Sequence, residues 1–362
     1  MNNSDKIFEK ALSLYPLSRE ELLQLYKFAP TCELMLIADQ LRQIHVPGNG
    51  VSWQIDRNVN ITNVCISGCK FCNFHCKPHQ TDKAYTTTIS EYCKKIDELI
   101  TLNGDQLLLQ GGLHPDYGLD FYVTLFSELK KRYPTIKLHA LGPPEIAHIA
   151  RKEKKSHTEI LEKLIEAGLD SLPGAGAEVL CDRVRKQLSP AKSDSQTWLN
   201  VMREAHKLNL ATSATMVFGH IETLEERIEH LVKIRELQAE KPHGAYGFLA
   251  FICWNMQLKG TEIGEQTGYK TATANDFIRT VAISRIALNN IKNVQASWLT
   301  AGKHIAQIAL HSGANDMGSI MIEENVVSSA GATNSLDAEE MQNAILEAGF
   351  TPWLRNQKYE AR

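Results

Sequence analysis

Between residues 51 and 335 the sequence alternates, about eight times, between a short strand-like run and a longer run with helical spacing. Strand–helix units in this number and order predict an α/β fold, a (β/α)8 barrel of the TIM type, although an open doubly wound sheet would give the same alternation. The predicted strands span residues 53–61, 104–110, 135–141, 168–173, 212–219, 246–254, 293–299 and 312–318. The predicted helices span residues 88–102, 119–133, 157–168, 195–209, 224–240, 274–290 and 301–313.

The segments on either side of this core are predicted to be helical. Residues 1–50 read as two or three helices that pack on the barrel as a lid, and Ser18 with Glu21 forms a capping-box pattern. Residues 336–362 predict a last helix followed by a polar tail. The chain is therefore expected to divide into an N-terminal helical segment, a barrel over residues 51–335, and a C-terminal helix with its tail.

Composition excludes several kinds of partner. The formal charge of -3 leaves no net basic field for nucleic acid or an anionic membrane, and the basic run at 151–157 is typical of a solvated helix end. No apolar run approaches the ~20 residues of a membrane helix, and the N-terminus lacks the apolar core of a signal peptide. We expect a cytoplasmic protein that binds neither nucleic acid nor membrane. In that reducing compartment a tight cysteine cluster indicates metal binding or catalysis rather than disulfides.

Unusual segments gather where the predicted strands end. Because the carboxyl ends of parallel strands meet at one rim of a barrel, these segments converge where barrel enzymes place their active sites. Any one of them is explained equally well as a good turn, but six on one rim indicate a site. They are the cysteine loop at 63–76, QGGLHP at 110–115, GPPE at 142–145, PGAGAE at 173–178, FGHIET at 218–223 and WNMQ at 254–257.

The cysteine loop, NVCISGCKFCNFHC, carries Cys65, Cys69, Cys72 and Cys76 in the pattern C-x3-C-x2-C-x3-C. Structural zinc sites usually take two separated ligand pairs, whereas thiolates at this density favour an iron–sulfur cluster. The similar ferredoxin pattern uses its fourth cysteine for a second cluster, and no second cysteine set exists here. A zinc-stabilised scaffold and a pure electron-transfer protein stay open as alternatives.

The pattern C-x3-C-x2-C with an aromatic residue before the third cysteine resembles the cluster loop of the radical S-adenosylmethionine (SAM) enzymes. The resemblance implies that Cys65, Cys69 and Cys72 bind three irons of a [4Fe–4S] cluster, that the fourth iron binds SAM, and that Cys76 is not a ligand. It also implies SAM contacts from the loop, the glycine pair and two later segments. These expected SAM-binding residues are Phe71, Gln110, Gly111, Gly112, Glu178, Gly219 and Glu222. The two glutamates are explained equally well as carboxylates at helix N-termini.

Further motifs resemble the cyclic dehypoxanthinyl futalosine synthases, radical SAM enzymes of the futalosine route to menaquinone. They include LQGGLHP, GAGAEVL, MVFGHIET, NVQASWLT, GANDMGS and MIEENVVSSAG. The resemblance implies an oxidoreductase acting on dehypoxanthine futalosine, in which a 5′-deoxyadenosyl radical removes the C4′ hydrogen of the ribose and the carbon radical adds to the aromatic ring. It also implies a low-potential electron donor, flavodoxin or ferredoxin. Aminofutalosine synthases and the radical enzymes of deazaflavin synthesis stay open as alternatives.

The resemblance also implies a substrate shell around the last two strand–helix units. Gln295, Ser297 and Trp298 are expected to alternate along a strand, with the indole covering an aromatic ring. The expected substrate-binding residues are His114, Gln295, Ser297, Trp298, Asn315, Ser319 and Asn325. The candidates for accepting the ring proton are His220, Asp316, Glu323 and Glu324. Plainer readings are a core tryptophan, turn-forming Asn and Asp residues beside glycines, and a solvated glutamate pair.

The cysteine loop departs from the family pattern after its third cysteine. Asn73, Phe74, His75 and Cys76 stand there, Ala175 replaces an expected glycine, and the segment QLKGTEI lacks the usual proline. These departures affect loop details and leave the three expected cluster ligands unchanged.

Overall fold

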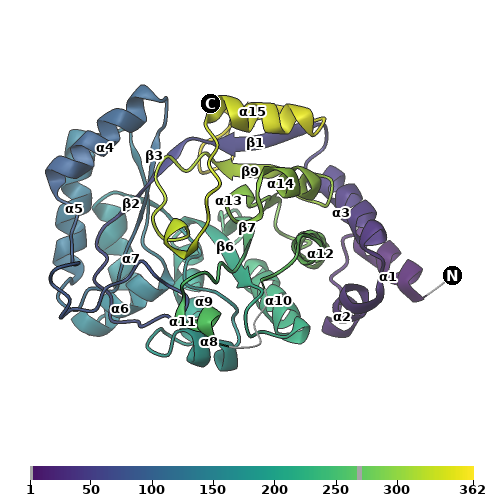
Figure 1. Ribbon diagram of the computed structural model, residues 1–362, viewed down its shortest axis with the longest axis horizontal. Coiled ribbons are helices and arrows are strands. Elements are labelled where there is room, and N and C mark those ends of the chain that lie inside the picture. The colour runs from purple at the N-terminus through teal and green to yellow at the C-terminus, as the bar shows by residue number, and fades with distance from the viewer. Residues whose placement is uncertain (1–2, 267–270) are drawn as a thin grey trace.

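One parallel sheet forms the centre of the molecule, whose computed structural model describes residues 3–266 and 271–362 (Figure 1). From β2 to β9 neighbouring strands follow chain order with no reversal. A doubly wound sheet would reverse its order at a switch point, so the predicted barrel-type fold is confirmed. The strands are β1 (Gly50–Gln54), β2 (Asp56–Asn60), β3 (Gln106–Gln110), β4 (Lys137–Ala140), β5 (Leu169–Leu172), β6 (Ala211–Phe218), β7 (Phe248–Asn255), β8 (Asn293–Gln295), β9 (Asp316–Ser319) and β10 (Thr351–Leu354).

The sheet curls on itself around one extended segment. Only Ile55 separates β1 from β2, yet β1 pairs with β9 and β10 whereas β2 pairs with β3. The chain after β9 continues along the same segment, because the amides of Ile320 and Ile322 donate to the carbonyls of Gln54 and Asp56 at 3.1 and 3.4 Å. The two ends of the sheet therefore meet at β1 and β2, and the strands surround a common interior.

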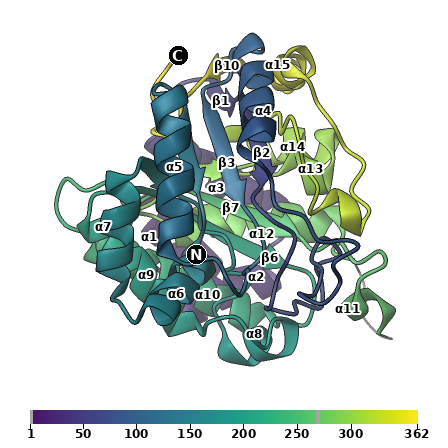
Figure 2. The same cartoon turned by 90° about the vertical axis from the view of Figure 1, so that its left-hand side faces the viewer.

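Helices cover the outer face of the sheet (Figure 1, Figure 2). The predicted helices are present, and the structure adds α6, α8, α11 and α13. Helix α6 begins with two prolines, which a helix accepts in its first turn. None of the described helices is both long and apolar enough to cross a membrane. The helices beside the sheet are α4 (Ile89–Thr101), α5 (Leu119–Arg132), α6 (Pro143–Glu153), α7 (His157–Glu166), α8 (Asp182–Leu188), α9 (Ser195–Lys207), α10 (Leu224–Glu240), α11 (Glu262–Glu265), α12 (Ala274–Ala287), α13 (Trp298–Ala301) and α14 (Lys303–Leu310).

The N-terminal helices pack on the flank of the sheet against α10 and α12. They are α1 (Asn3–Leu12), α2 (Arg19–Phe28) and α3 (Thr31–His45), and the capping box predicted at Ser18 and Glu21 starts α2. The buried hydroxyl of Tyr26 lies 2.7 Å from the hydroxyl of Thr280 and accepts a hydrogen bond from Arg227 at 2.8 Å. The division of the chain into three domains stays a prediction.

Three predicted segments differ from the structure. The strand at 53–61 breaks at Ile55, because its two halves pair with different neighbours. The strand at 293–299 ends at Gln295, and Trp298 begins α13 instead of lying on the strand, because the chain turns at Ala296, whose carbonyl accepts from the Trp298 amide at 2.8 Å. The expected polar tail includes β10, which adds to the free edge of β1; proline is tolerated in such an edge strand.

The C-terminal residues close the amino end of the barrel. The last helix, α15 (Ala338–Glu347), leads into β10, and Arg355 then reaches inward to Asp316, with Nε–Oδ2 and Nη2–Oδ1 distances of 2.5 and 3.1 Å. Gln357 accepts a hydrogen bond from Gln106, the first residue of β3, at 3.2 Å. The chain end thus plugs the barrel at the face opposite to the cysteine loop.

Candidate functional site

The cysteine loop, residues 63–76, leaves the carboxyl end of β2 and closes on itself. The Cys65 amide donates to the Cys76 carbonyl, and the Cys76 amide donates to the Asn63 carbonyl, both at 2.9 Å. The middle of the loop is held from outside, since the Lys70 amide donates to Leu188 of α8 and the Lys70 carbonyl accepts from Ile263 of α11 (2.9 and 3.1 Å). The loop is therefore a fixed part of the rim.

Two of the three expected ligands converge inside this loop. The Ser67 hydroxyl lies 2.9 Å from the Cys65 sulfur and 3.3 Å from the Cys69 sulfur, and both thiols are buried. The Leu113 amide donates to the Cys65 sulfur at 3.3 Å. Cys72, less buried, follows at the next turn of the loop, where its amide donates to the Cys69 carbonyl.

This donor set fits a [4Fe–4S] cluster. Within residues 3–266 and 271–362 no three or more His, Cys, Asp and Glu side chains are arranged around one metal ion. A cubane does not require such convergence, because each thiolate binds a different iron. Burial and amide-to-sulfur hydrogen bonds of the kind received by Cys65 are the surroundings in which proteins hold such clusters.

Cys76 closes the loop rather than lining its centre. Its backbone makes the two closing hydrogen bonds, and its buried thiol faces the Asn63 side-chain oxygen at 3.5 Å. Burial raises the pKa of the Cys76 thiol, which favours the protonated form. The expectation that Cys76 is not a cluster ligand stays a prediction, and these contacts are consistent with it.

The glycine pair after β3 lets the cysteine loop approach. A Cβ atom on Gly112 would lie 2.1 Å from the Val64 carbonyl oxygen and 2.8 Å from the Cys65 Cβ, so no larger residue fits. A Cβ atom on Gly111 would lie 3.0 Å from the backbone nitrogen and oxygen of Thr62, and Gln110 before it is half-buried on the inner face. These glycines therefore position the first cysteine, whatever else they contact.

Glu178 lies buried between two cations next to the loop. Its carboxylate is 2.8 Å from Lys192 and 3.5 Å from Arg185. Burial alone would raise the pKa of Glu178, but Lys192 and Arg185 hold it below its ordinary value. The Lys192 ammonium also lies 5.5 Å from the centre of the Phe71 ring, which links Glu178 to the cysteine loop.

Glu145 is a buried carboxylate that sequence reasoning did not assign, although the segment GPPE marked its place. It stands in the first turn of α6, and its side chain accepts a hydrogen bond from the backbone of Gly111. Burial raises the pKa of Glu145 to about 7. Among the described residues no lysine, arginine or histidine forms an ion pair with it, in contrast to Glu178.

The turn after β6 holds a third buried carboxylate. Glu222 accepts hydrogen bonds from the amides of Gly219 and His220 (2.6 and 2.9 Å) and pairs with Arg227 at 2.6 Å. Burial would raise the pKa of Glu222, but its bonds to His220 and Arg227 lower it to about 2. The His220 ring lies between Glu222 and the carbonyl of Val217, at 2.8 Å from each.

The other three candidates for proton acceptor lie in the segment from β9 to residue 324 and have partners inside the chain. Asp316 is held by Arg355 and by the Ser52 hydroxyl at 2.5 Å. Glu323 pairs with Arg57 at 3.0 Å and with Lys95 of α4. Glu324 accepts amide hydrogen bonds from residues 326–328 at 2.8–2.9 Å, at the start of the 3-10 turn η1 (Ser328–Ala330). The assignment of the proton acceptor stays a prediction.

Several expected substrate ligands are also bonded within the fold. Asn315 bonds to Arg285 and Asn293 at 2.7 and 2.9 Å, and the Ser319 hydroxyl donates to Asp56 at 2.5 Å. The Trp298 side chain is 2 % exposed, and its indole donates to the Ser319 carbonyl at 3.1 Å.

His114 lies apart from this group. It stacks on Tyr117 with ring centres 3.8 Å apart, next to α5. Gln295 and Asn325, in contrast, lie towards the interior: Gln295 fills the space over Gly318, and Asn325 donates to Asn60 at 3.0 Å.

The barrel interior is accessible, and Trp254 is part of its wall. In β7 the neighbours Phe251 and Cys253 are fully buried in the core outside the sheet, whereas Ile252 and Trp254 are half-buried. Because successive side chains of a strand face opposite sides, these two face the interior. The same alternation leaves Leu108, Gln110, Val217 and Gln295 half-buried on the inner face of other strands.

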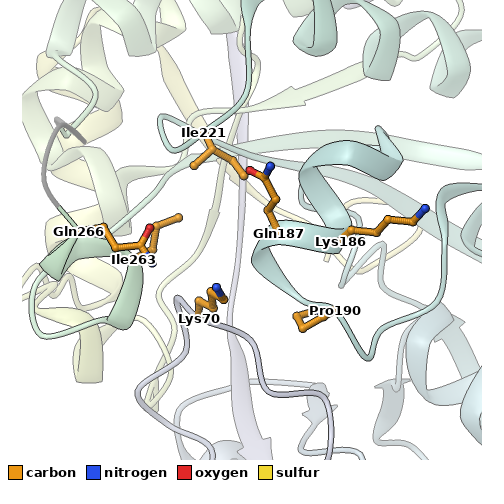
Figure 3. Close-up of a pocket in the computed structure, with 7 residues that line it drawn as sticks. All are labelled: Lys70, Lys186, Gln187, Pro190, Ile221, Ile263 and Gln266. Atoms are coloured by element: carbon orange, nitrogen blue, oxygen red, sulfur yellow. The ribbon is translucent and has the colours of Figure 1, made fainter.

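A cavity of about 400 Å³ opens beside the cysteine loop (Figure 3). In Figure 3 Lys70 of the loop lies across the opening from Ile221, which follows β6, with α8 and α11 on either side. A cleft of several hundred cubic ångströms suits a small organic ligand. Its lining residues are Lys70, Lys186, Gln187, Pro190, Ile221, Ile263 and Gln266.

Two family models match the chain. Residues 59–234 match the radical SAM superfamily, and residues 245–362 match the CofH/MqnC C-terminal region. The first match runs from the end of β2 through the cysteine loop into α10, and the second spans the wall from β7 to β10.

Curated relatives match over nearly the whole chain. A cyclic dehypoxanthine futalosine synthase of Streptomyces coelicolor is 40% identical, covering 98% of this chain and 88% of the relative. One of Halalkalibacterium halodurans is 38% identical, covering 98% and 94%. A 5-amino-6-(D-ribitylamino)uracil–L-tyrosine 4-hydroxyphenyl transferase of Archaeoglobus fulgidus is 37% identical, covering 90% and 93%. Among solved structures, methylornithine synthase has a TM-score of 0.72 at 16% identity, covering 97% of this chain and 98% of that one, which supports the fold.

Proposed function

This chain belongs to the radical SAM superfamily of enzymes, and we propose that it is a cyclic dehypoxanthinyl futalosine synthase in the futalosine route to menaquinone. Its substrate would be dehypoxanthine futalosine, which joins a ribose to an aromatic ring. The observation that carries the proposal is the cysteine loop, with Cys65 and Cys69 buried, on the rim of a barrel whose inner wall is accessible and partly aromatic. Relatives of that name, 40% and 38% identical over nearly the whole chain, support the choice of reaction.

Membership of the superfamily implies a [4Fe–4S] cluster and SAM. We propose that Cys65, Cys69 and Cys72 hold the cluster. When bound, the two cofactors supply a 5′-deoxyadenosyl radical that removes the C4′ hydrogen of the ribose. A flavodoxin or ferredoxin would deliver the electron. The remaining SAM contacts are proposed for Phe71, Gln110, Gly111, Gly112, Glu178, Gly219 and Glu222.

Glu145 joins this set as the carboxylate for a cationic group of SAM. SAM carries an ammonium and a sulfonium, and a buried carboxylate without an internal ion pair gains most from such a partner. Glu178 lacks this capacity because Lys192 and Arg185 already neutralise it. The hydrogen bond from Gly111 keeps the Glu145 carboxylate beside the glycine pair.

The interior wall would hold the aromatic ring of the substrate next to its ribose. Trp254 is a better candidate for stacking than the expected Trp298, because it is half-buried on the inner face whereas Trp298 is enclosed. Holding both reacting carbons in one dry cavity turns the ring addition into an intramolecular step and keeps water from the radical.

A second candidate function is transfer of the 4-hydroxyphenyl group of tyrosine to a ribitylaminouracil. The specific observation in its favour is the 37% identity, over 90% of this chain, to the Archaeoglobus protein of that name. The two reactions differ in substrates rather than in the initiating radical, so the shared cysteine loop does not separate them.

Anaerobic incubation separates the two. The reconstituted protein, SAM and a low-potential reductant are incubated with dehypoxanthine futalosine in one tube and with tyrosine plus the ribitylaminouracil in another. Mass spectrometry is expected to reveal the cyclic product only in the first tube. This product is two hydrogens lighter than its precursor, because one hydrogen atom goes to the adenosyl radical and the ring adduct then loses a proton and an electron. Consumption of tyrosine alone would overturn the proposed function in favour of the second.

A further inference from the structure

Two asparagines of β2 face the barrel interior. Their neighbour Arg57 points outward, where it bonds to Glu98 of α4 at 2.5 Å, and Val59 is buried in the core between sheet and helices. Because side chains alternate along a strand, Asn58 and Asn60 point the other way, into the interior. Both are almost fully enclosed, with 4 % and 3 % of their surface exposed.

Each of these asparagines carries a polar atom with no partner. Among the described residues nothing hydrogen-bonds to the Asn58 Oδ1 or the Asn60 Nδ2. A buried donor or acceptor left unpaired weakens the folded state, so native structures rarely keep one without a use for it. The hydroxyl of Ser297, two residues after β8, also has no hydrogen-bond partner among the described residues.

The orientation of Asn60 is fixed from behind. Its Oδ1 accepts a hydrogen bond from Asn325 at 3.0 Å, which leaves the amide nitrogen directed away. Asn325 also bonds to Glu323 at 3.2 Å, and Glu323 is held by Arg57 at 3.0 Å. The unpaired donor is therefore held in place by a network that runs from Asn325 through Glu323 to Arg57.

We propose that Asn58 and Asn60 bind a pair of neighbouring hydroxyl groups on the sugar of the substrate; the identity of that sugar, a ribose, rests on the proposed function. Residues two apart on a strand are separated by ~6.6 Å. A hydroxyl both donates and accepts, at ~2.8 Å from its partner, so two adjacent hydroxyls can span the free acceptor and the free donor. A carboxylate could not bind in this way, because an ionised carboxylate and the Asn58 oxygen are both hydrogen-bond acceptors.

The test is binding of the substrate to the holoenzyme without reductant, measured by calorimetry. Asn58→Leu, which keeps the side-chain shape, is expected to weaken binding of dehypoxanthine futalosine about tenfold, the equivalent of one lost hydrogen bond. SAM affinity and iron content are expected to stay unchanged. Asn200→Leu, on the exposed face of α9, is the matched control and should bind as the wild type does.

A substrate analogue lacking one ring hydroxyl completes a double-mutant cycle. It should bind the wild type about tenfold more weakly than the substrate and lose little more in Asn58→Leu. Equal binding of analogue and substrate by the wild type would overturn the inference, since the amides would then hold water only. If Asn58→Leu does not fold, the inference is tested by the wild type's affinities for substrate and analogue and by the substrate affinity of the Asn58→Ser variant.

The ribityl chain of the second candidate substrate also carries adjacent hydroxyls. A wild type that binds only the ribitylaminouracil, and binds it more weakly as Asn58→Leu, would refute the proposed function and support the hydroxyl site. A wild type that binds dehypoxanthine futalosine with an affinity untouched by the substitution would refute the hydroxyl site alone.

Discussion

Two carboxylates on the β9 side of the barrel have partners inside the protein, whereas three polar side chains on the β2 to β4 side are incompletely paired. On the first side Asp316 is held by Arg355, and Glu324 accepts amides from its own turn. On the second side Glu145 has no ion pair among the described residues, and Asn58 and Asn60 each keep an unpaired atom. Buried polar groups that have hydrogen-bond or ion-pair partners stabilise the fold. Buried polar groups without such partners can gain them from a ligand.

The largest expected effect tests the cysteine loop itself. Replacing Cys65, Cys69 or Cys72 by Ala is expected to abolish both the cluster and turnover, since each thiolate would hold one iron. Cys76→Ala should keep most of the iron and activity, because the thiol of Cys76 faces Asn63. Iron content and the visible absorption of anaerobically reconstituted protein measure the outcome. Loss of iron from the Cys76 variant would contradict the three-ligand assignment.

The second-largest effect tests the buried ion pair on the β9 side. Arg355→Leu leaves Asp316 charged, buried and unpaired, and breaking such a pair costs about 3–5 kcal/mol. The free energy of unfolding in urea should fall by that amount. The control is Arg203→Leu, whose partner Glu240 is largely exposed, and which should cost about 0–1 kcal/mol. Equal losses in the two variants would remove the contrast between buried and exposed pairs.

The third effect tests the unsaturated carboxylate. Glu145→Gln is expected to weaken SAM binding about tenfold, or 1.4 kcal/mol, by removing the charge that faces the cation. Since burial raises the pKa of Glu145 to about 7, the wild type should bind SAM more tightly as the pH rises through about 7, where the carboxyl ionises. The variant should lack this rise. A rise of the same size in Glu145→Gln would assign it to another group.

The smallest effect tests whether Glu324 caps a turn or acts as the general base. Glu324→Gln retains one acceptor oxygen for the amides of residues 326–328 and is expected to cost about 1 kcal/mol of stability, as for a lost helix cap. Its turnover at saturating substrate should stay within about twofold of the wild type, well short of the hundredfold typical for a lost general base. A well-folded variant without turnover would instead place the base on the β9 side.

The fold was predictable because alternation is a local signal. Strand-length and helix-length runs can be read from neighbouring residues, and the cysteine loop follows the first strand pair as expected. The misses occurred where local signals conflict with context. Pro143 and Pro144 read as a turn but start α6, and Pro352 lies in an edge strand that only β1 accommodates.

The site was less predictable because its character depends on distant partners. In the sequence Asp316 is a candidate proton acceptor, and only the structure shows that Arg355, 39 residues away along the chain, pairs with it. Trp254 and Trp298 both belong to strands predicted from the sequence, and whether either faces the interior depends on where its strand ends. Glu145 was overlooked because nothing in the sequence marks a carboxylate as buried and unpaired.

Because β1 pairs with β10, the sheet of the barrel is complete only after the C-terminal strand has been synthesised. Gln54 and Arg355 hydrogen-bond to each other although they lie 301 residues apart in the sequence. The edge of β1 that pairs with β10 therefore stays unpaired until the intervening strands have been synthesised. An exposed strand edge invites pairing with other chains. The nascent protein is therefore most prone to misassembly in the interval before its C-terminal residues emerge, and a tag fused at that end would act on the closing step.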